Sequence, residues 1–200
     1  MDSSAIIVVD CWNRHWDTNS QKSLDIGCPK INEFLCNMRK SGSLIIHCVS
    51  DVVGKVKYVE EKYKYIKRNK IDIMKELQDM NFPMVLDAPG TKIWTKVHDS
   101  IKIEETDFNT TDVNQIYNIL KQNNIKNLYY VGYHANICLL WTRPFSIMQM
   151  KNNFDGKIYL VENLTDWFGS FKKEVIEFYN KFVCKTINSK RVYEKNIIHN

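Results

Sequence analysis

The feature that most constrains this fold is a strand, a turn and a helix in immediate succession within residues 128–150. Residues 128–131 are too few for a helix and rich in β-forming side chains, so they predict a buried strand. Gly132 ends that run, and apolar residues at helical spacing follow from Ile137 to Met148. Because strands and helices alternate in this way, we expect a parallel sheet with helices packed on it.

The same alternation extends over the whole chain and predicts one α/β domain spanning residues 1–200. We expect three α/β/α layers around a mostly parallel, Rossmann-like sheet with strand order 3-2-1-4-5-6. The predicted strands are residues 5–9, 43–49, 92–97, 128–131, 157–161 and 183–187, and the predicted helices are residues 29–39, 56–66, 71–80, 112–123, 137–148 and 171–182.

Composition excludes several classes of protein. The 200 residues fit one domain, and 44% hydrophobic with 26% charged residues is ordinary for a globular chain. No apolar run is long enough to span a membrane, and the first residues do not read as a signal peptide. The six cysteines form no CxxC pair and no metal-ligand spacing, so free thiols in a reducing compartment are expected. We therefore expect a cytoplasmic protein that has no membrane partner.

The net charge of +5 arises from scattered lysines, apart from a basic cluster in residues 62–70. Tyrosines interleave with the lysines there, a composition that can bind nucleic acid. The solvated face of a helix is the preferred interpretation, because apolar positions alternate with the charges and Glu60 and Glu61 precede them. No nucleic-acid partner is predicted.

Cys138 stands just past the predicted strand, in the first turn of the following helix. Free N–H groups and the positive end of a helix dipole lower a thiol pKa and stabilise an oxyanion. Ligands also bind at the carboxyl ends of strands in open α/β sheets. The alternative is a buried structural cysteine in a core helix.

Asp10 ends the apolar run 5–9, which has the character of a central strand buried on both faces. A carboxylate at that position is costly to bury unless it is paired or functional. Trp12, His15 and Trp16 follow it and could wall a substrate pocket or simply pack beneath the helices. His47, inside a predicted strand, is interpreted as a core histidine with its hydrogen bonds satisfied.

The motif GYHANIC, residues 132–138, resembles the G-x-x-x-[DN]-x-C element of the isochorismatase-like cysteine hydrolases, which include nicotinamidases and N-carbamoyl amide hydrolases. The resemblance implies that Cys138 is the nucleophile and Asp10 its general base. It also implies a cis peptide bond between Tyr133 and His134, with the backbone N–H groups of His134 and Cys138 as oxyanion donors. The D-x-W-x-x-H-W form at Asp10 is similar to an uncharacterised subgroup of these hydrolases.

The same resemblance calls for a lysine at the end of the third strand, where it hydrogen-bonds the aspartate. Lys96 ends the predicted strand 92–97 and is the preferred candidate. Lys102 is the alternative, because its distance from Phe108 matches the lysine-to-phenylalanine spacing of the family. Strand-end placement is set by the sheet, whereas loop length can vary, so Lys96 is favoured.

The implied function is hydrolysis of a C–N bond in a small-molecule amide, through a thioester on Cys138 and an Asp10–Lys96–Cys138 triad. No cofactor is expected. Val52 and Val53 follow Asp51 where nicotinamidases carry metal-binding histidines, so no metal is expected either. A catalytically silent interaction protein and a nicotinamidase with atypical metal ligands remain alternatives. Members of the family that the motif resembles often form dimers or tetramers, so the resemblance implies a homo-oligomer.

Overall fold

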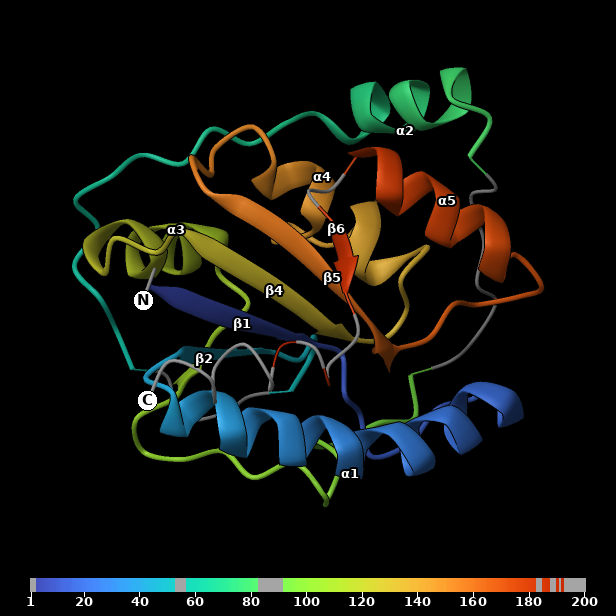
Figure 1. The fold of residues 1–200 in the computed structure, drawn as a ribbon, viewed down its shortest axis with the longest axis horizontal. Coiled ribbons are helices and arrows are strands. Elements are labelled where there is room, and N and C mark those ends of the chain that lie inside the picture. Colours follow the sequence, from blue (N-terminus) through green and yellow to red (C-terminus); the bar gives the residue numbers. More distant parts are fainter. Residues whose placement is uncertain are drawn as a thin grey trace.

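The computed structural model describes residues 3–52, 57–82, 92–182, 185–187, 190 and 192. It is a three-layer α/β/α fold around one parallel sheet of strand order β3-β2-β1-β4-β5-β6, as predicted (Figure 1). The strands are β1 (Ser4–Val9), β2 (Leu44–Cys48), β3 (Phe108–Asn109), β4 (Asn127–Gly132), β5 (Lys157–Thr165) and β6 (Lys185–Ile187). The helices are α1 (Thr18–Lys40), α2 (Lys70–Asp79), α3 (Val113–Gln122), η1 (Cys138–Thr142), α4 (Ile147–Met150) and α5 (Lys172–Phe182).

The two faces of β1 bury their side chains in two separate cores. Ile6 and Val8 pack with the buried side chains of α1, such as Phe34. Ala5, Ile7 and Val9 belong to the larger cluster, to which α3, α4 and α5 contribute. Figure 1 shows α1 on one side of the sheet and α3, α4 and α5 on the other. Burial on both faces explains why the strand sequence is apolar without alternation.

The register of the sheet brings three strand ends together. Val9, the last residue of β1, is level with Cys48 of β2 on one side and Gly132 of β4 on the other. Since all three strands are parallel, the segments that follow them leave the sheet at the same edge. Asp10 is thereby placed between the loops after β2 and β4.

Helix α1 is longer than the predicted 29–39 and begins at Thr18. Asp17 caps it by accepting a hydrogen bond from the Ser20 N–H. Pro29 therefore lies inside the helix rather than at its start. The packing of residues such as Leu24 and Cys28 against the sheet compensates for the proline's missing donor.

The predicted third strand, residues 92–97, is wrong. Its only described pairing is one antiparallel bridge between Val97 and Trp12, while Phe108–Asn109 pairs with β2 as β3. The period-2 pattern of residues 92–97 reflects this local bridge beside the chain after β1, where Asn13 N–H donates to the Lys96 carbonyl. Lys96 is consequently not at the end of a sheet strand.

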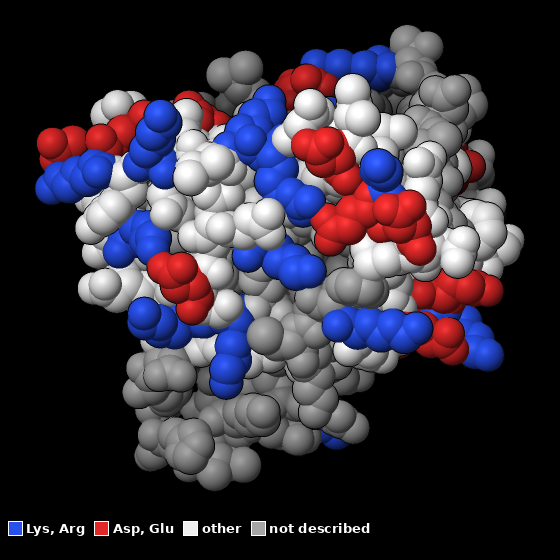
Figure 2. Space-filling model, turned by 90° about the horizontal axis from the view of Figure 1, so that it is seen from above, with Lys and Arg blue, Asp and Glu red and all other residues white. Residues whose placement is uncertain are grey.

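The predicted helix 56–66 is also wrong within the described residues, because residues 57–69 form no helix. Carboxamide side chains of the underlying helical layer hold the backbone of this segment. Asn118 accepts from the N–H groups of Lys62 and Tyr63, and Gln149 accepts from that of Arg68. The basic cluster is thus no helix face; Figure 2 shows basic and acidic side chains intermingled on the side of the molecule where α2 lies.

The helix expected after Cys138 is broken into two short pieces. Residues Cys138–Thr142 form one π-helical turn, and a regular helix resumes only at Ile147. Pro144 lies between them and cannot donate the hydrogen bond that a continuous helix needs. Among the described residues, no helix is both long enough and apolar enough to cross a membrane.

Candidate active site

Asp10 is fully buried and follows β1 in a left-handed backbone conformation, with a φ of 46°. Its Oδ1 accepts a hydrogen bond from the Ser50 N–H at 2.8 Å, and its Oδ2 accepts one from Nε of Arg143 at 2.8 Å. An aspartate tolerates this conformation better than most residues, but the strain is characteristic of functional positions. The carboxylate is therefore held from two sides by groups outside its own strand.

Cys138 lies close enough to Asp10 for the carboxylate to raise the pKa of its thiol. The His134 carbonyl accepts from the N–H groups of Ile137 and Leu139, the residues on either side of the cysteine. The peptide bond between Tyr133 and His134 is cis, at the position where the family resemblance places such a bond. Gly132 has a φ of 110°, and a Cβ there would lie 2.0 Å from the Val9 carbonyl oxygen. The glycine thus allows β4 to approach β1 closely enough for Cys138 to reach Asp10.

The pKa of Cys138 is raised to about 12, first by burial and then by the charge of Asp10, while Arg143 acts in the opposite direction. The expectation of a lowered thiol pKa at a helix N-terminus is therefore wrong. The turn at Cys138 is too short to carry a substantial dipole, and the neighbouring carboxylate opposes a second negative charge. In the resting protein the thiol holds its proton.

Arg143 supplies the positive charge beside Asp10. Burial alone would lower the pKa of its guanidinium, but the Asp10 carboxylate more than offsets this and raises it. The guanidinium also lies 5.7 Å from the ring centroid of Trp12, within range of a cation–π contact. Its side chain is 26% exposed, so the cation bridges the buried carboxylate and the surface.

Lys96 does not join this site. Its side chain is 58% exposed and forms an ion pair with Asp99 at 2.5 Å. The prediction of an Asp10–Lys96–Cys138 arrangement is wrong in its lysine, because residue 96 lies on a bridge segment and not at the end of β3.

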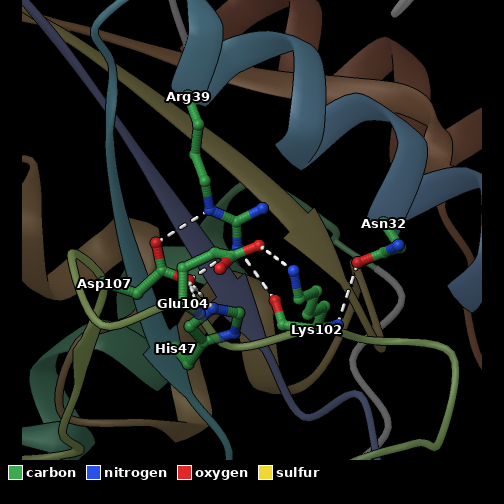
Figure 3. A network of polar contacts seen from close by, with 6 residues as sticks. All are labelled: Asn32, Arg39, His47, Lys102, Glu104 and Asp107. Atoms are coloured by element: carbon green, nitrogen blue, oxygen red, sulfur yellow. Dashed lines mark hydrogen bonds and ion pairs between the residues drawn. The ribbon is translucent and has the colours of Figure 1, made fainter.

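Lys102, the alternative lysine, lies elsewhere in the molecule. Its Nζ pairs with Glu104 at 2.7 Å, and its backbone carbonyl accepts from Arg39 of α1 (Figure 3). The same network holds Asp107, which accepts hydrogen bonds from Arg39 and contacts Nε2 of His47 at 3.0 Å. His47 is therefore a core histidine, as predicted, but only its Nε2 has a hydrogen-bond partner among the described residues. Lys102 belongs to a structural network.

Trp12, His15 and Trp16 lie around the site in two groups. The Trp12 indole N–H donates to the Ser50 carbonyl at 3.1 Å, and its ring stacks on Trp94 at 4.1 Å. His15 and Trp16 lie 5.1 Å apart, and Phe168 lies 5.7 Å from Trp16. The prediction that these side chains line a substrate pocket stays a prediction.

His134 completes a ring cluster that consists of His15, Trp16, His134 and Phe168. Its ring lies 5.5 Å from His15 and 5.7 Å from Phe168, measured between centroids. Burial, with a smaller effect of His15, lowers the His134 pKa to about 4, so its imidazole is neutral at physiological pH. Both ring nitrogens are buried and have no hydrogen-bond partner among the described residues.

Arg143 is the site residue that the sequence interpretation missed. One signal could have found it: Arg143 is the only Lys, Arg, Asp or Glu residue in the otherwise uncharged stretch 127–150. A lone charge in a segment predicted to be buried calls for a buried partner of opposite sign. The position of Phe168, brought in by the loop after β5, had no comparable signal.

The donors at this site do not match a metal centre. In the part of the chain that the structure describes, no three His, Cys, Asp or Glu side chains converge to hold a metal ion. The side chain nearest to Asp10 is instead the cationic Arg143, and a guanidinium has no lone pair to offer a metal. No step below is routed through a metal.

No protein-family model and no curated protein matches this sequence. Solved structures do match it in fold. A cysteine hydrolase from Pseudomonas syringae pv. phaseolicola has a TM-score of 0.63 at 12% identity, covering 98% of this chain and 93% of its own. N-carbamoylsarcosine amidase from Thermoplasma acidophilum has 0.57 at 14% identity, covering 93% of this chain and 95% of its own.

A third structure, the zinc complex of the pyrazinamidase of Pyrococcus horikoshii, has a TM-score of 0.52 at 18% identity, covering 93% of this chain and 99% of its own. These similarities extend over nearly the whole length of each chain. Together with the strand order and the strand-end positions of Asp10 and Cys138, they show that this chain has the fold of the isochorismatase-like cysteine hydrolases.

Proposed function

We propose that this protein is a cysteine hydrolase that cleaves the C–N bond of a small amide through a thioester on Cys138. The observation that carries the proposal is the position of the Cys138 thiol beside the buried carboxylate of Asp10, which raises the thiol pKa. A nucleophile within reach of a base, with the base held by a third group, is the recurring arrangement of covalent catalysis.

Asp10 acts first as a general base. As the sulfur of Cys138 attacks the substrate carbonyl carbon, the thiol proton passes to the Asp10 carboxylate. The resulting tetrahedral intermediate collapses, the C–N bond breaks, and the amine leaves with the proton from Asp10. Water then attacks the thioester, with Asp10 again taking a proton, and the acid product leaves as the thiol is restored. Because the thiol pKa is high, the proton leaves during attack and not beforehand.

Arg143 takes the place that the resemblance gives to a lysine. Its Nε–H donates to Oδ2 of Asp10 and gives this buried carboxylate a counter-charge. The same charge lowers the cost of negative charge on the sulfur and on the oxygen of the intermediate. An arginine remains protonated throughout, so Arg143 orients and stabilises but does not transfer protons.

The backbone N–H of His134 is the proposed oxyanion donor, because the His134 backbone lies close enough to Cys138 to lower the thiol pKa. A carbonyl carbon bonded to the Cys138 sulfur would place its oxygen within reach of this N–H group and of the Cys138 N–H. Donors fixed in the backbone need no reorganisation during the reaction, which makes them effective at this position.

The test is to incubate the purified protein with a panel of small amides and to trap the acyl-enzyme by acid quench. Intact-protein mass spectrometry should detect the added acyl group, and peptide mapping should assign it to Cys138. Cys138→Ala should carry no acyl group and release no amine. Cys36, which is exposed, serves as the internal control for non-specific acylation.

Two results would contradict the proposal. Amine release that persists in Cys138→Ala would show that another residue performs the chemistry. The absence of acylation across the whole panel would favour the catalytically silent interaction protein.

A further inference from the structure

His134 is a buried polar side chain for which the described fold provides no partner. It is 3% exposed, and neither ring nitrogen has a hydrogen-bond partner among the described residues. Leaving a buried polar group unpaired costs about 1–3 kcal/mol, so native proteins rarely retain one without a reason. His47, which is also buried, differs in that its Nε2 contacts Asp107, so only its Nδ1 has no partner among the described residues.

The position of His134 ties this imidazole to the reacting sulfur. The carbonyl of the same residue accepts from the N–H groups of Ile137 and Leu139 at 3.1 Å, and these two residues flank Cys138. The ring then packs edge-on against His15, and His15 lies 6.0 Å from Trp12, over which Arg143 is placed. His134 therefore belongs to the wall of the site that holds Asp10 and Cys138.

The loop that carries this wall is fixed and not free to rearrange around the histidine. The Asn136 carboxamide donates to the Phe168 carbonyl and accepts from the Phe168 N–H, both at 2.8 Å. The Ala135 N–H donates to the Asp166 carbonyl at 2.6 Å, and the Tyr179 hydroxyl donates to the Ala135 carbonyl at 2.5 Å. The backbone on either side of the unpaired imidazole thus has its own partners.

We propose that the His134 imidazole is a specificity-determining group that hydrogen-bonds the substrate beside the scissile carbonyl. This inference rests on the proposed hydrolase function. The neutral ring offers one donor and one acceptor, and the ring cluster around it is aromatic. The substrate class that fits is a small amide with an uncharged oxygen or nitrogen atom next to its carbonyl group. The rest of such a substrate would be apolar or planar.

The first experiment needs no substrate and compares melting temperatures of His134→Leu and His47→Leu. If the His134 side chain is kept for binding at the expense of stability, its replacement should stabilise the protein. The melting temperature of His134→Leu should then be several degrees higher than that of the wild-type protein. His47→Leu should instead melt at a lower temperature, because it removes one of the hydrogen-bond partners of buried Asp107. A fall in the melting temperature of His134→Leu would overturn the proposal, since it would reveal a structural role.

The second experiment measures acylation of Cys138 by butanamide and 2-methoxyacetamide, which differ only in a CH₂ group replaced by oxygen. The wild-type protein should favour the ether amide by at least tenfold in kcat/KM, and His134→Leu should abolish that preference through KM. His134→Gln, which keeps a donor and an acceptor, should restore part of it.

An equal preference in the wild-type protein and in His134→Leu would overturn the specificity role while leaving the hydrolase function standing. Failure of both amides to acylate the wild-type protein, with the wider panel also negative, would instead contradict the hydrolase function. The two failures are therefore distinguishable, and the comparison of melting temperatures decides the role of His134 in either case.

Discussion

Nε of Arg143 donates to Oδ2 of Asp10 across 2.8 Å, from the break between two short helices to the end of the central strand. This contact gives the buried carboxylate a counter-charge that the sequence interpretation had assigned to Lys96. Arg143 directly follows the turn that begins with Cys138, and its charge acts to lower the pKa of the thiol.

Arg143→Met should lower kcat by about 100-fold, because the substitution removes the cation that stabilises negative charge at the site. It should also cost about 3–5 kcal/mol of folding stability, since Asp10 would be left buried and unpaired. Lys96→Met is the matched control and should change both quantities little, because Lys96 pairs only with exposed Asp99. Steady-state kinetics and urea denaturation measure the two effects. A loss of activity in Lys96→Met with full activity in Arg143→Met would restore the original assignment.

Alkylation of Cys138 by iodoacetamide should be slow at pH 7 and rise about tenfold per pH unit toward pH 12, because the thiolate fraction follows the raised pKa. Asp10→Asn should accelerate alkylation at pH 8 while it abolishes amide hydrolysis. The carboxylate raises the thiol pKa, so its removal makes the sulfur more acidic and deprives the reaction of its base. Peptide mass spectrometry follows Cys138, with exposed Cys36 as the reference. Slower alkylation in Asp10→Asn would contradict this account of the thiol.

Folding stability should fall as pH decreases from about 6.5 to about 4, with His134 as one contributor. The unfolded histidine binds a proton near pH 6.5, whereas the buried one resists protonation until about pH 4, so the unfolded state binds more protons in this window. The contribution has an upper limit of about 3 kcal/mol. Urea denaturation at several pH values gives the free energy of unfolding at each pH. This free energy should fall less steeply with decreasing pH in His134→Leu than in the wild-type protein. Equal slopes would mean that the His134 pKa is not lowered by burial.

Gly132→Ala should destabilise the protein by more than about 3 kcal/mol, because the new Cβ would meet the Val9 backbone at a residue with positive φ. Gly42→Ala is the control for backbone conformation alone. Gly42 also has a positive φ, of 79°, but nothing lies within 4 Å of its added Cβ. Its cost should be about 1 kcal/mol. Similar melting curves for the two variants would show that the close approach of β4 to β1 is not needed.

The sequence predicted the parts of the fold that depend on local pattern. The strands β1, β2, β4 and β5 come from apolar runs that bury one or both faces of the strand. The helices that follow them in the chain have apolar residues at helical spacing. The positions of Asp10 and Cys138 followed from the ends of two such strands. The prediction of a sheet strand over residues 92–97 was wrong because a period-2 pattern cannot distinguish a sheet strand from a single bridge.

The prediction of a helix over residues 56–66 was wrong for a different reason. Their alternating charged and apolar residues resemble an amphipathic helix, but the partners of their backbone groups are side chains distant in sequence, such as Asn118 and Gln149. Local propensity has no access to such partners, and tertiary contacts override it.

The sequence by itself therefore determined the layered α/β architecture and the strand ends that carry the acid and the thiol, because these depend on burial patterns read along the chain. Only the tertiary structure decided which cation pairs with Asp10, that the Cys138 thiol keeps its proton, and that the His134 imidazole finds no hydrogen-bond partner among the described residues. These properties depend on distances between segments remote in sequence and on how completely each group is removed from water, and both exist only once the chain has packed.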